Sequence, residues 1–514
     1  MSQQFICPTT MKLSELICDL PVESVRGSDD LCIHRIVEDS RLAEEGCLFV
    51  ARAGLKSDGR MFIGDAIEAG AVAVLCNDAE AVPPGVSPGV SPGVAVIVAN
   101  DVPLIAAMLA ERFHHHPSRR LRLVGITGTN GKTTTAHLIH HILKAADTPC
   151  GLIGTVCIDN GRETHQGDLT TPSAFEISRL LSDMCENKCA TCVLEASSHA
   201  LHQRRTAGLD FHIGVFTNLS GDHMDYHGTS QAYLDAKAIL FESLPEDGWA
   251  VVNLDDPVSQ EIISRSRSRI LTCGIDAQKA DCHAHIGRQT IDGLEATMTG
   301  PWGSIEIRLP LVGRHNVMNA LQAFTVAHLL GIDAIAIQQS LIQCSPPPGR
   351  LEPVGCGEIE YRVFVDYAHT DDALDNVLGS LKPLVPAGGV LRVVFGCGGD
   401  RDRTKRPRMA RIACRWADEV IITSDNPRTE SPEAILKDIL AGVPDDRDES
   451  AYCLVDRQKA IEFAIERSRA GDVILIAGKG HEDYQIIGST RRPFDDRIIA
   501  GKAIAHRLAG VGAS

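Results

Sequence analysis

The 514-residue chain has few aromatic residues and no excess of basic ones. Phe, Trp and Tyr make up 4% of the sequence, so side chains on which nucleic-acid bases could stack are scarce. Lys and Arg number 50 against 67 Asp and Glu, which gives a formal charge of −17. Because binding along a phosphate backbone needs a basic surface, this balance argues against a protein that coats nucleic acid.

Long apolar runs are also missing. No stretch approaches the roughly 18 apolar residues of a membrane-spanning helix. Residues 1–8 lack the basic segment and apolar core of a signal peptide. The 17 cysteines are odd in number and scattered, which favours free thiols in a reducing compartment over a disulfide framework. The sequence therefore predicts a cytoplasmic protein.

The length predicts about three domains, at roughly 100–200 residues each. Two breaks divide the chain. A histidine triplet followed by Pro117 reads as a solvated linker, and three successive prolines at 346–348 would stop a helix and stiffen a connection. We therefore expect domains at residues 1–118, 119–347 and 348–514.

Short apolar runs alternate with helical patterns along the whole chain, which is typical of an α/β protein. The runs predict strands at residues 47–51, 71–75, 94–98, 392–395, 420–423 and 473–476. Residues 62–70 predict a helix that ends on a glycine, and the repeat at 84–94 predicts an exposed loop. We expect a small N-terminal α/β domain, a central P-loop domain with a mostly parallel sheet, and a C-terminal Rossmann-like α/β domain.

The strongest functional signal is the segment LVGITGTNGKTTT at residues 123–135. An apolar run enters a glycine-rich turn, and a helix follows. Glycines let backbone N–H groups close around phosphate oxygens, and a helix N-terminus adds positive charge. Lys132 can reach the β- and γ-phosphates, and the Thr133 hydroxyl can ligate Mg²⁺. The segment is a P-loop variant, because Ile126 stands where the usual spacing has its first glycine. The expected ATP contacts of this loop are Gly128, Thr129, Asn130, Gly131, Lys132, Thr133 and Thr134.

Two further segments offer metal ligands. Residues 191–195 read as a buried strand that ends in Glu195, and residues 216–228 are rich in oxygen and imidazole groups, among them His223. Together with a P-loop threonine, such groups can hold the Mg²⁺ that screens ATP phosphates. The His223–His227 spacing alone is weak evidence, since surface histidines give it as well.

The motif GTNGKTTT, in this setting, resembles the Mur ligase superfamily of ADP-forming amide-bond synthetases. The resemblance implies that Glu195 and His223 bind metal. It also implies that Lys237 reacts with CO₂ to become a carbamate (N6-carboxylysine) and an anionic Mg²⁺ ligand. Without the resemblance, Lys237 would be interpreted as a solvated helix lysine. Asn316 would hydrogen-bond adenine.

The resemblance extends to the third domain. Arg350 would reach the nucleotide, Asp366 in the DYAH segment would accept from the ribose hydroxyls, and His369 would lie near the phosphates. Nucleotide contacts from two domains imply closure on binding, with water excluded from a labile intermediate.

The predicted strands of the third domain each run into a polar loop, at residues 396–402, 424–428 and 477–483. Ligands of open parallel sheets bind outside the carboxyl ends of the strands, so these loops predict one crevice. Its expected substrate contacts are Arg401, Asp425, Asn426, Pro427, Arg428, Gly478 and Glu482. Most of the six basic residues between 400 and 411 would otherwise belong to a solvated loop.

These motifs resemble the MurE branch of the superfamily. In that branch DNPR, here residues 425–428, accompanies the addition of meso-2,6-diaminopimelate, and lysine-adding members lack its arginine. The chemistry agrees, because Arg428 can grip the distal carboxylate of diaminopimelate, whereas the distal ammonium of lysine would be repelled. Glu482 can pair with the distal ammonium of diaminopimelate. The resemblance assigns the UDP-MurNAc-peptide to Ser40, Thr170, Thr171, Ser197, Gln203 and Arg205.

The expected activity is an ATP-dependent ligase of cytoplasmic peptidoglycan precursor synthesis. The γ-phosphate would move to the D-Glu γ-carboxylate of UDP-MurNAc-L-Ala-D-Glu, and the amine of meso-diaminopimelate would attack the acyl phosphate. The expected cofactors are Mg²⁺ and CO₂, as the carbamate. Partners are small molecules only, without nucleic acid or membrane, and the protein is expected to be a monomer. Two alternatives stay open: a folylpolyglutamate-synthase-like ligase, and a P-loop regulatory NTPase.

Overall fold

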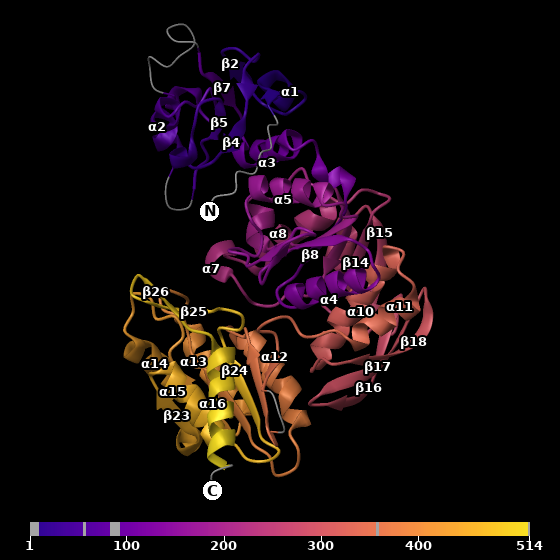
Figure 1. Cartoon of the computed structure of the whole chain (residues 1–514), viewed down its shortest axis with the longest axis vertical. Coiled ribbons are helices and arrows are strands. Elements are labelled where there is room, and N and C mark those ends of the chain that lie inside the picture. Colours follow the sequence, from indigo (N-terminus) through magenta and orange to yellow (C-terminus); the bar gives the residue numbers. More distant parts are fainter. Residues whose placement is uncertain (1–9, 55–57, 83–92, 356–358, 512–514) are drawn as a thin grey trace.

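The computed structural model describes residues 10–54, 58–82, 93–355 and 359–511. Three α/β units follow one another along the chain, from the N-terminal unit at one end of the molecule to the C-terminal unit at the other (Figure 1). The repeat predicted as an exposed loop lies outside the described residues, apart from its last two positions. Within the described residues, no helix combines the length and the apolar composition that crossing a membrane requires.

The first unit is a five-stranded sheet between helices. The sheet has the spatial order β2 (Ser24–Arg26), β7 (Ala95–Val98), β6 (Ala73–Cys76), β5 (Cys47–Val50) and β4 (Arg35–Val37), of which only the β2–β7 pair is antiparallel. A small ladder joins β1 (Met11–Lys12) and β3 (Cys32–Ile33). The helices and 3₁₀ turns are α1 (Leu13–Ile17), η1 (Ser40–Leu42), η2 (Gly59–Phe62), α2 (Ile63–Glu68), η3 (Ala79–Ala81) and α3 (Val102–Phe113). The strands and helix predicted here are confirmed to within about two residues.

The middle unit contains the longest sheet. Its spatial order is β11 (Thr164–His165), β10 (Ile158–Asp159), β9 (Cys150–Ile153), β12 (Thr191–Glu195), β8 (Arg122–Thr127), β13 (Phe211–Phe216), β14 (Trp249–Asn253), β15 (Arg269–Gly274), β16 (Cys282–Thr290), β17 (Gly293–Gly300) and β18 (Gly303–Leu309). The pairs from β9 to β16 are parallel, and both ends of the sheet are antiparallel. The sheet is therefore mostly parallel, as predicted.

Helices cover both faces of this sheet. Side chains of successive strand residues point to opposite sides, so one strand packs against both helical layers. Val124 and Ile126 of β8 pack under one helical layer, and Leu123 packs under the other. The first layer contains α4 (Lys132–Ala145), α10 (Arg314–Leu329) and α11 (Ala334–Ile342). The remaining helices and turn are η4 (Pro117–Arg120), α5 (Ala174–Glu186), α6 (Ser198–His202), α7 (Met224–His227), α8 (Ser230–Glu242) and α9 (Ser259–Arg265), and the second layer includes α5, α6, α8 and α9.

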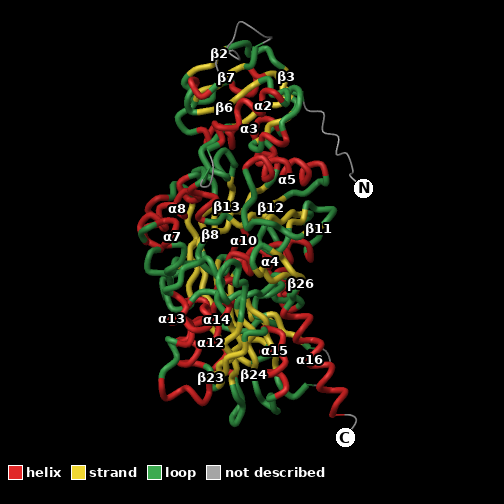
Figure 2. Tube along the Cα trace, turned by 90° about the vertical axis from the view of Figure 1, so that its left-hand side faces the viewer, coloured by secondary structure: helices red, strands yellow, loops and turns green. Residues whose placement is uncertain are grey.

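The third unit has a Rossmann-like sheet in the order β19 (Glu352–Val354), β20 (Arg362–Asp366), β24 (Val473–Ala477), β21 (Leu391–Phe395), β22 (Glu419–Thr423) and β23 (Ala451–Leu454). All pairs except β19–β20 are parallel, which confirms the predicted βαβ units. The other elements are α12 (Asp371–Leu381), η5 (Lys382–Leu384), α13 (Lys405–Trp416), α14 (Pro432–Leu440), η6 (Asp445–Ser450), α15 (Arg457–Glu466), the hairpin β25 (Tyr484–Ile487) and β26 (Thr490–Pro493), and α16 (Asp496–Val511). Figure 2 shows α12 to α16 around the yellow strands of this unit.

The middle unit contributes to the apolar core of the third. Val312, which precedes α10, is 5% exposed and belongs to the same cluster as Phe364 and Leu378. Ile291, at the turn between β16 and β17, packs against this cluster. Beside it, Arg362 Nε donates to Asp292 Oδ1 over 3.0 Å. The hairpin tip thus docks on the third unit.

Two segments predicted as solvated connections differ in part from that prediction. The segment after α3 is not a loose linker, because Pro117 and Ser118 are buried and the Ser118 hydroxyl donates to the buried Glu111 carboxylate over 2.6 Å. The basic stretch in the third unit is largely the start of α13. Within it, Arg406 is fully buried and pairs with Glu430 and Asp438, at 2.8 Å each. Carboxylates thus hold one arginine that composition alone assigns to solvent, whereas Arg403, Arg408 and Arg411 are exposed.

The cysteines of the described segments are free. Cys189 and Cys192 share the spacing of a redox or metal motif, but Cys192 is fully buried in β12. Burial raises the pKa of its thiol well above the usual value.

A fully buried ion pair anchors the C-terminal helix. Arg457 donates to both carboxylate oxygens of Asp496, over 2.8 and 2.7 Å, and both side chains have no exposed surface. We predict that Arg457→Leu lowers the free energy of unfolding by about 3–5 kcal/mol, because it leaves the Asp496 charge buried and unpaired. Urea unfolding followed by circular dichroism measures this loss.

Arg415, which is 66% exposed and lies 3.7 Å from Asp375, provides the control. Arg415→Leu should change the stability by less than about 1 kcal/mol, because solvent screens an exposed pair. Equal losses in the two variants would contradict the role given to the buried pair.

Candidate active site

The glycine-rich turn lies at the carboxyl end of β8, in the centre of the parallel strands. At two positions of the turn there is no room for a side chain, so glycine is required. A Cβ on Gly128 would lie 1.8 Å from Thr217 Oγ1, and a Cβ on Gly131 would lie 2.5 Å from Asn319 Oδ1. Both have a positive φ, of 150° and 85°, which side chains disfavour. The loop therefore keeps its backbone open at the N-terminus of α4.

The lysine of the loop folds back on the turn. Lys132 Nζ donates to the carbonyls of Gly128 and Thr129, over 2.9 Å each. Burial lowers the pKa of this ammonium, and the nearby Glu195 carboxylate opposes the shift. A phosphate that displaced the two carbonyls would meet a cation already held at the loop.

Glu195 is fully buried at the carboxyl end of β12, next to the loop. Its Oε2 accepts from Thr133 Oγ1 over 2.9 Å and from Thr155 Oγ1 over 3.0 Å. Its Oε1 accepts from the Thr155 N–H over 2.9 Å. A carboxylate and a hydroxyl in contact are hard oxygen ligands of the kind that Mg²⁺ takes.

Lys237 lies on α8 and is 1% exposed. Its Nζ sits 4.2 Å from the ring centroid of Tyr233. Burial, with the Lys132 charge as a second cause, holds the pKa of Lys237 well below its usual value. The neutral amine that this favours is the form that reacts with CO₂.

His223 belongs to a cluster of aromatic and imidazole rings beside this lysine. Its ring centroid lies 4.7 Å from that of His199 and 6.1 Å from that of Tyr233. His227 lies 5.1 Å from Tyr233. The described residues contain no group of three or more His, Cys, Asp or Glu side chains that could hold a metal. A cation here would therefore need other ligands as well, such as the Thr133 hydroxyl, phosphate oxygens or a modified Lys237.

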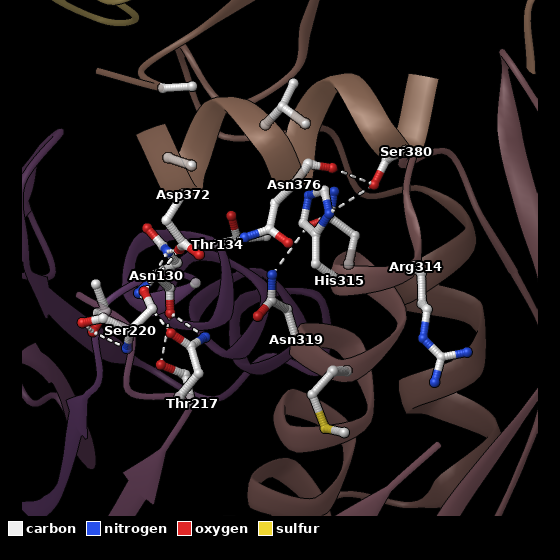
Figure 3. A pocket seen from close by; sticks show the side chains of 18 of the residues that line it. Asn130, Thr134, Thr217, Ser220, Arg314, His315, Asn319, Asp372, Asn376 and Ser380 are labelled. Atoms are coloured by element: carbon white, nitrogen blue, oxygen red, sulfur yellow. Dashed lines mark hydrogen bonds between the residues drawn. The ribbon is translucent and has the colours of Figure 1, made fainter. Parts of the chain in front are cut away.

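A cavity of about 1020 Å³ opens from the loop toward the third unit. Asp372, near the start of α12, bridges the two sides: its Oδ2 accepts from Ser220 Oγ over 2.7 Å and from Asn130 Nδ2 over 3.0 Å (Figure 3). Deeper in, His315 Nδ1 lies 3.4 Å from Ser380 Oγ. Burial lowers the pKa of His315 to about 4, so the ring is neutral at pH 7.

The predicted ATP contacts outside the loop line this cavity. Arg350 packs over the ring of Tyr367 at 4.6 Å and places Nη2 3.4 Å from Thr133 Oγ1. Asp366 accepts from two backbone N–H groups, and burial raises its pKa. Asn316 donates to the Val312 carbonyl over 2.8 Å, and His369 Nδ1 lies 2.9 Å from the Tyr367 carbonyl.

The buried Nε of Arg350 has no described hydrogen-bond partner, which is unusual for a guanidinium. Such an orphaned donor at the cavity wall fits an anionic ligand.

A second site lies at the carboxyl ends of β21, β22 and β24. Asp425, Asn426 and Pro427 are buried there, and Arg401 is exposed. Arg428 has a positive φ of 52° and donates from Nη1 to the Gly399 carbonyl over 2.8 Å. Contacts between the three predicted loops therefore bring them together at this edge of the sheet.

Several of these positions depend on close packing. A Cβ on Gly478 would lie 2.8 Å from Asp425 Oδ2. Glu482 accepts from Asn426 Nδ2 over 2.9 Å. The crevice adjoins the cavity, since the rings of Tyr367 and His481 lie 5.3 Å apart.

The residues predicted for the muramoyl-peptide gather near Glu195. Thr171 Oγ1 donates to the Glu195 carbonyl over 2.6 Å and lies 3.2 Å from Ser197 Oγ. Thr170 accepts from Thr155 over 3.0 Å. Arg205 donates to the Thr171 carbonyl and to Gln203, over 2.8 Å each. Ser40 lies in η1 of the first unit, and no described hydrogen bond joins it to this group.

Sequence reasoning missed several residues of the two sites. Ser220 and Asn218 lie in the polar run after β13, where position at a strand end could have indicated them. Asp372 contacts Asn130 across 242 positions, and no pattern in one sequence reports such a contact. Lys479 sits between two predicted crevice residues, and its full burial became visible only in the structure.

Comparisons with known proteins place the chain in a family. The UDP-N-acetylmuramoyl-L-alanyl-D-glutamate–2,6-diaminopimelate ligase of Synechococcus elongatus is 41% identical over 501 residues, which cover 97% of this chain and 99% of the relative. This chain belongs to the Mur ligase family. Family models match residues 32–115 (Mur ligase family, catalytic domain), 126–327 (Mur ligase middle domain) and 349–480 (Mur ligase, glutamate ligase domain).

Solved structures agree with the fold of this Mur ligase. A UDP-N-acetylmuramoyl-L-alanyl-D-glutamate–2,6-diaminopimelate ligase aligns with a TM-score of 0.68 at 33% identity, over 97% of this chain and 99% of that chain. The folylpolyglutamate synthase of Mycobacterium tuberculosis, solved with ADP and AMPPCP, aligns with a TM-score of 0.59 at 18% identity, over 79% of this chain and 95% of that chain. The second likeness concerns the fold alone.

Proposed function

We propose that this Mur ligase adds meso-2,6-diaminopimelate to UDP-MurNAc-L-Ala-D-Glu and cleaves ATP to ADP and phosphate, in the synthesis of a peptidoglycan precursor. The observation that carries the proposal is the adjacency of two sites: a cavity built on a P-loop variant, and a crevice that contains Asp425, Asn426, Pro427 and Arg428 at strand ends. We also infer that it works as a monomer on small molecules, since both sites are built from one chain, and that it is cytoplasmic, as its sequence predicts.

The phosphate-binding side follows from the loop. We assign the triphosphate to the backbone of residues 128–134 and to Lys132, with Arg350 closing from the third unit. Thr133, Glu195 and His223 would hold Mg²⁺, which supplies charge stabilisation for the transferred phosphoryl group. Asn316, Asp366 and His369 would contact the nucleoside and phosphate parts of ATP.

The proposed site of the acceptor substrate lies on the side of Glu195 away from the nucleotide. Thr170, Thr171, Ser197, Gln203 and Arg205 would position the D-Glu carboxylate near the γ-phosphate, and Ser40 would hold the uridine end. The acyl phosphate formed there hydrolyses in water, so closure of the third unit protects it. The contacts of Asp372 with Asn130 and Ser220 support a closed arrangement.

The domain limits at residues 118 and 347 fit this division of labour. Each large sheet lies within one of the three ranges, and the cavity lies between the second and third. We therefore assign the uridine nucleotide to the first domain, ATP to the second and the amino acid to the third.

The proposed reaction has a direct test. ATP consumption by the purified protein should require the UDP-MurNAc-dipeptide and meso-diaminopimelate together, because the amine must trap the acyl phosphate. A coupled ADP-release assay measures this dependence. Turnover on a folate substrate would favour the folylpolyglutamate alternative, and hydrolysis independent of any amino acid would favour the regulatory NTPase.

Lys237 provides a test of the carbamate. Burial in a ring of apolar and aromatic groups favours the neutral amine, and reaction with CO₂ would turn it into an anionic ligand on a rigid helix. Lys237→Ala should reduce kcat by at least about a hundredfold, since removal of one charge-stabilising group in a catalytic site costs that much. Addition of a short-chain carboxylate should restore part of the activity.

The matched control is Lys279→Ala, at an exposed lysine of the same unit. It should keep full activity and gain nothing from the carboxylate. An active Lys237→Ala enzyme would refute the carbamate assignment.

Arg428 provides a test of the amino-acid site. We expect Arg428→Ala to raise the KM for meso-diaminopimelate by about tenfold to a hundredfold, because a charge-assisted contact to the distal carboxylate is lost. The KM for ATP should stay the same, which steady-state kinetics with each substrate varied in turn would establish. An unchanged amino-acid KM would rule out the carboxylate clamp.

A further inference from the structure

A fully buried lysine lies behind the amino-acid crevice. Lys479 follows Gly478 at the carboxyl end of β24 and has no exposed side-chain surface. Its Nζ lies 3.0 Å from Glu482 Oε2 and 3.2 Å from Asn426 Oδ1. Asn426 Nδ2 in turn donates to Glu482 Oε2 over 2.9 Å. The three side chains form a closed triad.

The triad fixes which atoms remain for a ligand. Two donors, from Lys479 and Asn426, occupy Glu482 Oε2, so Oε1 is the carboxylate oxygen left to accept a further hydrogen bond. Asn426 Oδ1 also accepts from the Ile486 N–H over 2.9 Å, which ties the triad to the β25–β26 hairpin. The same hairpin holds Arg428, whose N–H donates to the Ile486 carbonyl over 3.1 Å. The acidic and basic ends of the crevice thus share one support.

The triad also fixes the charge of the crevice. Glu482 would be the acidic group facing a distal ammonium, and Lys479 neutralises it at 3.0 Å. Arg401 and Arg428 then add positive charge that Asp425 offsets only in part. A buried ammonium keeps its influence over several ångströms, because little water lies between it and a ligand.

Two amino acids with the same spacing between their amino groups respond differently to this charge. The distal end of meso-diaminopimelate carries an ammonium and a carboxylate, and its net charge is zero. The distal end of lysine carries an ammonium alone. With Glu482 neutralised by Lys479, the positive charge of Arg401 and Arg428 repels the distal end of lysine and leaves the zwitterionic end nearly unaffected.

We propose that Lys479 is a positioning residue that sets amino-acid specificity: through Glu482, its buried ammonium holds the crevice at a charge that rejects a distal cation. The inference rests on the proposed function, and it adds to Arg428 a second determinant that need not touch the substrate. Arg428 attracts the distal carboxylate, and Lys479 excludes ligands that lack it.

The test compares kcat/KM for meso-diaminopimelate and for L-lysine in the full-length enzyme, with UDP-MurNAc-dipeptide and ATP saturating. Lys479→Met keeps the length of the side chain and removes its charge. We expect the ratio of the two kcat/KM values to fall by about tenfold or more in favour of lysine, as expected for one charge removed from a screened site. The control is Lys459→Met, at an exposed lysine of the same unit, which should leave the ratio unchanged.

A double-mutant cycle separates specificity from structural support. In a Glu482→Gln background, Lys479→Met should return the ratio to near that of the unmodified enzyme, because this pair is again without net charge. Lys479→Arg, which keeps the charge, should keep the preference for meso-diaminopimelate. An unchanged ratio in folded Lys479→Met, or a double variant whose ratio stays as low as that of Lys479→Met, overturns the inference.

The charge argument stays testable if Lys479→Met does not fold. Glu482→Gln leaves the lysine unneutralised, so the ratio should then rise in favour of meso-diaminopimelate, and a ratio that does not rise overturns the inference. Failure of the proposed function looks different: the unmodified enzyme would then add neither amino acid.

Discussion

The nucleotide cavity depends on contacts between the middle and third units, among them the hydrogen bonds that Asp372 accepts from Asn130 and Ser220. The P-loop belongs to the middle unit, and Arg350, Asp366 and Asp372 belong to the third. Because the carboxyl edges of two parallel sheets are opposed here, residues far apart in the sequence can act on the two ends of one reaction.

The same arrangement explains how the acid and the amine are kept apart until the acid is activated. Glu195 gathers Thr133 and Thr155 on the nucleotide side, and its backbone carbonyl accepts from Thr171 on the acceptor side. In the proposed reaction the amino acid would occupy the crevice beyond Tyr367. Its amine would then approach from the third unit, so closure would both complete the phosphate site and deliver the nucleophile.

The sequence predicted much of this, for physical reasons. Strand and helix periodicity located the parallel sheets, and glycine spacing located the loop. Position at strand ends was enough to bring Arg401, Asn426 and Glu482 into one crevice. Burial of charge could not be predicted. The sequence alone suggests that Arg406 and Lys479 are solvated, because it does not show that the fold buries both side chains beside carboxylates. Contacts between units, such as that of Asp372, depend on docking geometry that no local pattern encodes.

Val312 and Ile291 show that the boundary near residue 347 does not separate the hydrophobic packing of the two units. Both come from the middle unit, yet both pack with the core of the third. Excision of residues 348–514 would uncover an apolar patch where these side chains had been and would remove the ion pair of Arg362 with Asp292. The third unit is thus a separate sheet whose core includes side chains of the middle unit, and the border drawn by function cuts through a shared hydrophobic core.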